Sequence, residues 1–130
     1  MQAIDTFLET WNKREAPAES PLTNTNSRKY NGLDVVLSQS ARNGRTVRIN
    51  HIVSNKRRKG ELKKFLRWIV AQADKGDFDL TMAAQPINRH YEDGISKDKL
   101  KETAEKVGFE MRFEYPDELG YEMIRHPAAK

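Results

Sequence analysis

Residues 46–86 constrain the fold most, because they contain a complete succession of strand, helix and strand. The first part, residues 46–54, is rich in β-branched side chains and predicts a strand. Residues 60–75 then repeat apolar positions every three to four residues, which predicts an amphipathic helix that Gly76 ends by taking a positive φ. Residues 77–84 alternate apolar and polar side chains and predict a second strand. Short connections around one helix make the two strands parallel, as in a βαβ unit.

The first strand is interrupted and leads into a basic turn. Its apolar side chains alternate up to Ile49 and resume out of phase at Ile52, which predicts a β-bulge between them. Residues 56–59, KRRK, place four cations directly before the expected start of the helix at Gly60. Unpaired N–H groups and the positive end of the helix dipole favour an anion there. The turn therefore predicts a phosphate or pyrophosphate site, although a solvated basic loop explains the charge run as well.

This stretch resembles the acetyl-coenzyme A signature of the GNAT superfamily, the GCN5-related N-acetyltransferases. The family pattern is Arg or Gln, two residues, Gly, one residue, then Gly or Ala, between a bulged strand and a helix. Arg57 and Gly60 match it, and Leu62 stands where Gly or Ala is usual. The segments ADKGDFDLTMAAQP and LKETAEKVGF follow in the order of the family's next strand and next helix. The resemblance covers residues 33–127 and is to small single-domain members of bacteria and their phages.

The resemblance implies acetyl-coenzyme A as cofactor and acetyl transfer to an amine of a protein or a small molecule as reaction. It also implies that the strands flanking the helix splay apart to leave a cleft for the coenzyme. The backbone of the bulged strand would pair with the pantetheine arm, and the basic turn would wrap the pyrophosphate and meet the ribose phosphate. The cofactor-binding residues expected on this basis are Ile52, Val53, Lys56, Arg57, Arg58, Lys59, Gly60, Glu61 and Leu62.

One family feature is absent from the sequence. Many members take the proton for the departing thiolate from a tyrosine four residues before the Gly-Phe that ends the late helix. Ala104 occupies this position and has no proton to give. Tyr91 and His90, which follow the 77–84 strand, and His51 on the bulged strand are the substitute catalytic candidates, although a surface or packing role is the simpler interpretation of each. A catalytically silent member that binds a protein partner is therefore the alternative function.

The remaining segments predict a single α/β (α+β) domain over the whole chain, with a mixed, mostly antiparallel sheet and helices on both faces. The resemblance implies that this is an acyl-CoA N-acyltransferase-like fold. Residues 3–14 predict a packing helix, and residues 97–107 predict another, capped by Ser96 and closed by Gly108. Residues 15–29 are rich in Pro, Ser, Thr and Asn and predict a long loop.

Three further strands are expected. Residues 33–40 form an antiparallel hairpin with the bulged strand through an Asn-Gly turn. Residues 109–115 alternate apolar and charged side chains and pair with residues 120–125 as a second hairpin. The apolar stripe of the 109–115 strand is expected in the core and consists of Phe109, Met111, Phe113 and Tyr115.

The amino-acid composition argues against several other functions. The 130 residues fit one domain, and the absence of cysteine excludes disulfides and thiolate metal sites. The three histidines are far apart, so no metal is expected. The net charge of +4 is compatible with nucleic acid, but the cations gather in one turn without interleaved aromatic residues, so specific nucleic-acid binding ranks last. No apolar run is long enough to cross a bilayer, and a soluble, cytoplasmic chain is expected.

Overall fold

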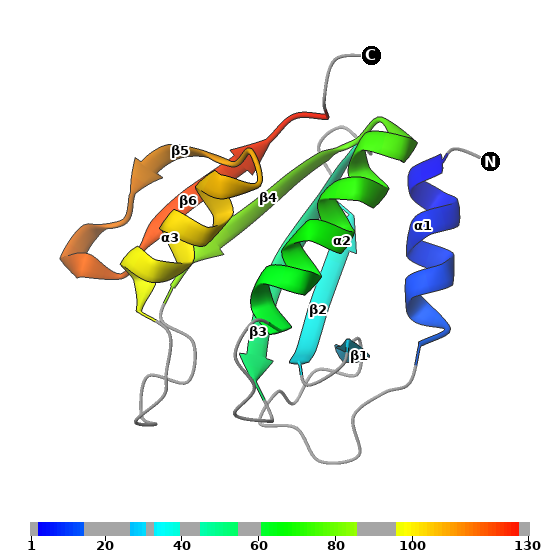
Figure 1. Cartoon of the computed structure of the whole chain (residues 1–130), viewed down its shortest axis with the longest axis horizontal. Coiled ribbons are helices and arrows are strands. Elements are labelled where there is room, and N and C mark those ends of the chain that lie inside the picture. The colour runs from blue at the N-terminus through cyan, green and yellow to red at the C-terminus, as the bar shows by residue number, and fades with distance from the viewer. Residues whose placement is uncertain are drawn as a thin grey trace.

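The computed structural model describes residues 3–14, 27–30, 33–39, 45–54, 61–85 and 96–127. These residues form an α+β fold in which three α-helices pack on a six-stranded mixed sheet (Figure 1). The helices are α1 (Ala3–Asn12), α2 (Glu61–Gly76) and α3 (Lys97–Lys106). The strands are β1 (Ser27–Tyr30), β2 (Leu33–Gln39), β3 (Thr46–Ser54), β4 (Asp79–Ala84), β5 (Glu110–Glu114) and β6 (Tyr121–Arg125).

The strands lie in the order β1-β2-β3-β4-β6-β5, so the last strand of the chain is inserted between β4 and β5. β3 and β4 are parallel neighbours in the sheet, and α2 connects them in the chain, which confirms the predicted βαβ unit. All the other neighbouring strands are antiparallel, and the β2–β3 and β5–β6 hairpins are confirmed. The predicted Asn-Gly turn between β2 and β3 lies outside the described residues.

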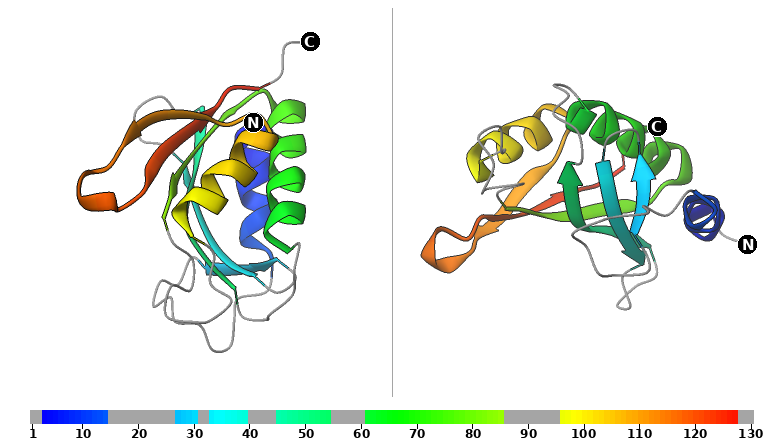
Figure 2. Two further views of the ribbon diagram at one scale, coloured as in Figure 1. Left: turned by 60° about the vertical axis from the view of Figure 1, so that its left-hand side comes forward. Right: turned by 90° about the horizontal axis from the view of Figure 1, so that it is seen from below.

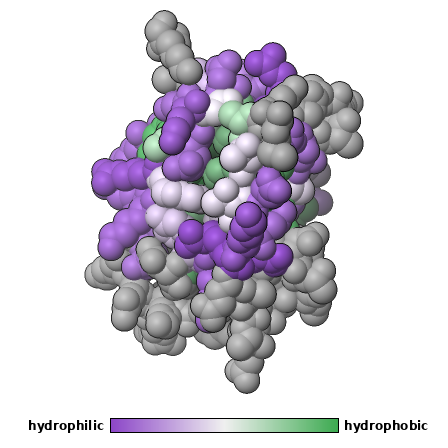
Figure 3. Space-filling model, turned by 90° about the vertical axis from the view of Figure 1, so that its right-hand side faces the viewer, coloured by the Kyte–Doolittle hydropathy of each residue, from purple (hydrophilic) through white to green (hydrophobic). Residues whose placement is uncertain are grey.

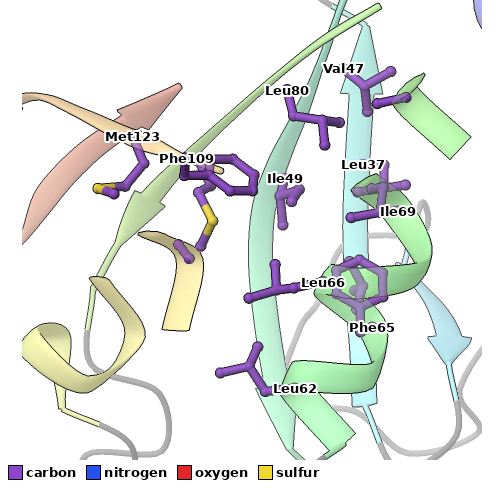
Figure 4. Packing of buried hydrophobic residues seen from close by; sticks show 14 of the residues in the cluster. Leu37, Val47, Ile49, Leu62, Phe65, Leu66, Ile69, Leu80, Phe109 and Met123 are labelled. Atoms are coloured by element: carbon purple, nitrogen blue, oxygen red, sulfur yellow. The ribbon is translucent and has the colours of Figure 1, made fainter. Parts of the chain in front are cut away.

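One face of the sheet carries the hydrophobic core. α2 buries its apolar stripe against alternate residues of β2, β3 and β4, and α3 adds Leu100 and Ala104 to the same cluster (Figure 4). Full burial of a Leu or Phe side chain contributes about 1.5–3 kcal/mol, so burial of this stripe stabilises the βαβ unit strongly. All three helices join this single cluster and lie on one side of the sheet (Figure 2). The described helices therefore do not meet the expectation of helices on both faces.

α1 packs beside α2 through aromatic side chains. The ring of Trp11 lies 6.2 Å from that of Phe65, and the ring of Phe7 lies 5.7 Å from that of Trp68. Aromatic pairs at such distances contribute about 0.5–1.5 kcal/mol beyond the burial of their area. The outer side of α1 is polar, in agreement with the mostly hydrophilic surface on this side of the molecule (Figure 3).

The end of the predicted loop over residues 15–29 is wrong, because β1 begins at Ser27. β1 pairs antiparallel with β2, and Arg14 Nε donates a hydrogen bond to the carbonyl oxygen of Lys29 at 2.9 Å. The sequence SRKY contains one apolar residue, so its strand conformation comes from pairing with β2 and not from a local pattern. The earlier part of the predicted loop lies outside the described residues.

The predicted ends of α3 are confirmed, whereas the predicted end of α2 differs in detail. Ser96 caps α3 by accepting a hydrogen bond from the Lys99 N–H at 3.1 Å, and Gly108 closes it at φ +100°, as expected. Gly76 is the last residue of α2, but the positive φ belongs to Asp77, at 55°. A Cβ on Gly76 would lie 3.4 Å from the Cβ of Ala3, so the glycine lets α1 approach α2.

The predicted burial of the β5 stripe is wrong. Arg112 is an extra residue in the β5–β6 register, because Met111 pairs with Met123 and Phe113 with Glu122. Such a bulge moves the side chains that follow it, here Phe113, to the other face of the strand. Met111 precedes the bulge and is exposed because β5 is an edge strand on which every residue is exposed. Phe109 is 3% exposed, whereas Met111 and Phe113 are 47% and 49% exposed.

Candidate functional site

The candidate site is the end of the parallel pair where β3 and β4 separate. Their pairing ends at Ile49 and Met82, although β3 continues to Ser54 and β4 to Ala84. Figure 1 shows the two strands diverging toward their carboxyl ends, next to the start of α2. Within the described residues, the 50–54 segment of β3 has a strand neighbour on its β2 side only.

A bulge at Asn50 accompanies this separation. Leu37 of β2 pairs with Ile49 and Val36 pairs with His51, which leaves Asn50 as the extra residue. Its Nδ2 donates to Ser38 Oγ at 2.7 Å, so the side chain fastens the bulged strand to β2. The bulge is confirmed at the predicted place, and it redirects β3 away from β4.

β4 ends as sharply on the other side of the gap. The Gln85 N–H donates to the Ala83 carbonyl at 3.0 Å, which forms a three-residue turn at the end of β4. Gly120, at φ +129°, packs against the Ala84 carbonyl, and a Cβ there would overlap that oxygen. The glycine thus allows β6 to begin beside the last residue of β4.

Two of the predicted cofactor-binding residues lie along this gap. Ile52 pairs with Val35 and packs against the core while remaining partly exposed. The backbone of Val53 pairs with Asp34 of β2. Because β4 has departed, the backbone edge of this segment on the β4 side is not paired with it. The segment therefore suits the pairing with an extended ligand that was predicted for Ile52 and Val53.

The whole of the predicted basic turn and the glycine after it lie outside the described residues, namely Lys56, Arg57, Arg58, Lys59 and Gly60. The same holds for the catalytic candidates Tyr91 and His90. α2 begins at Glu61, so the unpaired N–H groups of its first turn lie at the gap end of the sheet (Figure 1).

Glu61 and Leu62 turn their side chains inward. Leu62 is 8% exposed and belongs to the core, as its helical phase predicts. Glu61 is 7% exposed; its Oε1 lies 4.0 Å from Lys64 Nζ, and its Oε2 has no hydrogen-bond partner among the described residues. The Glu61 carboxylate also acts on Tyr30. Burial raises the pKa of Tyr30, the positive charge of Arg14 opposes this rise, and the Glu61 carboxylate adds to it. Only the backbone N–H of Glu61 is suited to a phosphate, because its carboxylate would repel one.

Ala104 lies inside the core, with no exposed surface. A tyrosine at this position would need space that the surrounding side chains occupy. The structure therefore gives a packing reason for alanine here.

A cluster at the start of α3 was not expected from the sequence. Tyr121 donates its hydroxyl hydrogen to Asp98 Oδ1 at 2.7 Å, and Lys97 Nζ donates to the Tyr121 oxygen at 3.3 Å. These hydrogen bonds with Tyr121 raise the pKa of Lys97 and lower that of Asp98. Tyr121 pairs with Ala84, so its phenol belongs to the same end of the sheet as the gap. The sequence carries no signal for this cluster, because its members are joined only by tertiary structure.

A second cluster lies on the sheet face opposite the helices and consists of Arg48, Thr81, Tyr115 and Glu122. Arg48 donates to both carboxylate oxygens of Glu122, at 2.7 and 3.0 Å, and Tyr115 donates to Oε1 at 2.7 Å. Arg48 Nη1 also lies 3.3 Å from Thr81 Oγ1. This polar cluster lies beside the gap, since Glu122 pairs with Ala83 of β4.

The electrostatics of the polar cluster fit a fixed ion pair. Burial acts to raise the pKa of Glu122, but the hydrogen bonds from Arg48 and Tyr115 outweigh it and hold that pKa below its usual range. The hydrogen bond to Glu122 raises the pKa of Arg48. Burial and the Glu122 carboxylate together raise the pKa of Tyr115. The cluster is therefore suited to holding the sheet together and not to transferring protons near neutral pH.

In comparisons with known proteins, no family model, curated protein or solved structure matches the chain. Among the described residues, no group of three or more histidine and acidic side chains is placed to hold a metal ion. Within the same part of the chain, no helix is both long and apolar enough to cross a membrane. The geometry at the carboxyl ends of β3 and β4 is thus the main guide to function.

Proposed function

We propose that the chain is an acetyl-coenzyme A-dependent N-acetyltransferase of the GNAT type, with an acyl-CoA N-acyltransferase-like fold. The observation that carries the proposal is the separation of β3 and β4 at the Asn50 bulge, directly before α2. The resemblance in the sequence implies such a splay as the coenzyme cleft, and periodicity alone does not predict one. The order of bulged strand, helix, parallel strand, late helix and terminal hairpin also agrees with the resemblance.

The proposed binding mode uses backbone groups more than side chains. The pantetheine arm would pair with the edge of Ile52 and Val53 that β4 leaves unpaired. The pyrophosphate would meet the basic turn and the N–H groups of the first turn of α2. Glu61 weakens this site electrostatically, because its buried carboxylate lies at the same helix end. The cations of the turn are therefore expected to contribute strongly to affinity.

Calorimetry and hydrogen exchange with coenzyme A test the site. Saturating coenzyme A should slow exchange in residues 50–62, and Arg57→Glu should weaken binding by about tenfold or more, since it places a negative charge beside phosphates. Arg67→Glu is the matched control, because Arg67 is exposed on α2 and lies about 9 Å along the helix axis from Glu61, where the helix begins. If both reversals weaken binding equally, or exchange in residues 50–62 is unchanged, the binding site is not the one proposed.

Catalysis requires a proton for the departing thiolate, and two phenols are candidates. Tyr91 is the candidate from the sequence, and Tyr121 is the one that lies at the gap end within the described residues. Replacing the donor by phenylalanine should lower kcat while leaving coenzyme affinity intact, the pattern of a group that acts in the transition state. Mass-spectrometric detection of acetyl transfer by wild type, Tyr91→Phe and Tyr121→Phe separates the two. Transfer that neither substitution slows would mean that the donor is neither phenol and is another group, such as His90, or solvent.

A catalytically silent protein with the same fold is the second candidate, and Glu61 and Ala104 favour it. A buried carboxylate at the helix start opposes phosphate, and a core alanine removes the usual donor. This candidate predicts no acetylated product with any amine acceptor, whether or not coenzyme A binds. Binding and product are thus measured separately.

A further inference from the structure

Asp34 is the buried charged group whose place in the fold is hardest to explain. Asp34 is 0% exposed, and neither of its carboxylate oxygens has a hydrogen-bond partner among the described residues. Leu33 and Val35 on either side belong to the core under the helices. Because side chains alternate along a strand, Asp34 lies on the face opposite the helices.

An unpaired buried carboxylate is costly and rare. The great majority of buried polar atoms in proteins have a partner, and an ionised group without one loses its hydration for nothing in return. A strand sequence such as LDVVL would gain stability from an apolar residue at this position. The carboxylate therefore calls for a partner that arrives from outside the described part of the chain.

The position of Asp34 connects it to the proposed cleft. It pairs with Val53 in the segment of β3 that has separated from β4. The proposed acceptor amine must approach the thioester at this gap, and Asp34 lies one strand away from it, on β2. This step rests on the proposed function and assigns the acceptor side of the same site.

The chemistry of a single carboxylate selects its ligand. Calcium, magnesium and zinc need several protein ligands, and no such group exists among the described residues. A primary ammonium carries one positive charge and three N–H donors, which two carboxylate oxygens can accept in a buried setting. We infer that Asp34 binds an amine acceptor through the acceptor's cationic group, which is a primary ammonium at the end of an alkyl chain.

Lys29 is the competing explanation. It stands opposite Asp34 in the β1–β2 register, so its ammonium could reach the carboxylate in solution. The two explanations differ in what removal of the charge does to the free protein. A carboxylate held by Lys29 stabilises the fold, whereas one kept for a ligand costs stability.

Two substitutions and three probes make the test. Asp34→Asn keeps the shape and removes the charge, and Asp34→Val replaces the group by a β-branched residue suited to a strand. Asp79→Asn is the matched control, because Asp79 alternates onto the same face at the far end of β4 and is paired with His126 Nδ1 at 2.9 Å. Calorimetry without coenzyme uses Nα-acetyl-lysinamide, spermidine and the uncharged Nα-acetyl-norleucinamide.

The inference expects that Nα-acetyl-lysinamide or spermidine binds the wild type and that Nα-acetyl-norleucinamide does not. The two amines distinguish a lysine side chain from a polyamine as the source of the ammonium. Asp34→Asn should weaken amine binding by about tenfold or more, and Asp79→Asn should not. Asp34→Val should raise the Tm of the free protein by roughly 4 °C.

Three outcomes would overturn the inference. They are amine binding that is indifferent to Asp34→Asn, no binding of either amine at millimolar concentrations, and a fall of several degrees in Tm for Asp34→Val, which would show that the carboxylate already has a stabilising partner. Because these measurements omit the coenzyme, they stand or fall separately from coenzyme binding. A protein that binds the amine through Asp34 but not coenzyme A would refute the proposed transferase and keep the amine site.

Discussion

Two carboxylates on the same face of the sheet are treated in opposite ways. Glu122 is 7% exposed and receives hydrogen bonds from Arg48 and Tyr115, whereas Asp34 is 0% exposed and receives none from the described residues. Burial is similar, so the difference lies in the partners. The fold builds a complete set of donors around one carboxylate and leaves the other to a ligand, which separates a group that holds the sheet together from one that is suited to binding.

The largest expected effect comes from removing the main partner of Glu122. Arg48→Met leaves that carboxylate buried with only the hydrogen bond from Tyr115, and we expect a loss of about 3 kcal/mol of unfolding free energy. The value is at the low end for buried pairs, because the Arg48 side chain is 33% exposed. Urea denaturation measures it.

Arg45→Met provides the matched control. Arg45 also pairs with a carboxylate, that of Asp77, but at 3.8 Å and with both side chains more than half exposed. Such surface pairs contribute about 0–1 kcal/mol, so little change is expected. Similar losses in the two variants would show that burial of Glu122 does not decide its dependence on Arg48.

The pH dependence sharpens the same comparison. Glu122 has a lowered pKa in the folded chain, so the stability it contributes is present above its unfolded pKa, about 4.3, and is lost as the pH falls through the lower folded value. In Arg48→Met, burial remains while the main donor is gone, so the pKa should rise above the unfolded value. The deficit of the variant relative to wild type should then shrink between neutral pH and about pH 4. A deficit that is constant with pH would mean that lost packing, and not charge, is the cause.

The local elements of this fold were accessible from the sequence. The α2 stripe, the Asn50 bulge and the Ser96 cap each depend on residues within a few positions of one another. Their physical causes are helical periodicity, a phase slip along one strand, and a side-chain cap. Such causes act in any chain with this local pattern, so the pattern predicts them.

What the sequence could not show depends on distant partners. Arg48 and Glu122 are 74 positions apart, and Asp34 reads in LDVVL as an ordinary solvent-facing residue. The register shift at Arg112 exposes Phe113, and nothing in the regular alternation of β5 marks it. At the candidate site the sequence predicted the bulged strand and helix start, but the gap itself arises where β3 and β4 stop pairing.

The smallest expected effect concerns the second partner of Glu122. Tyr115→Phe removes one hydrogen bond to the carboxylate and keeps both bonds from Arg48, so about 1 kcal/mol of stability should be lost. Phe113→Ala, the ring that packs edge-on against Tyr115 at 5.0 Å, controls for ring contact, and its exposure of 49% implies a change within about 0.5 kcal/mol.

Tyr115→Phe and Arg48→Met together complete the argument about partners. If the two donors share one carboxylate, the double variant should lose less than the sum of the single losses, because the second removal acts on a group already left unsatisfied. A thermodynamic cycle from urea denaturation measures this coupling. Additive losses would mean that Tyr115 and Arg48 stabilise the sheet independently, and the contrast with Asp34 would then rest on Arg48 alone. Coupled losses would show that the sheet satisfies Glu122 as a unit, which is the arrangement that Asp34 lacks.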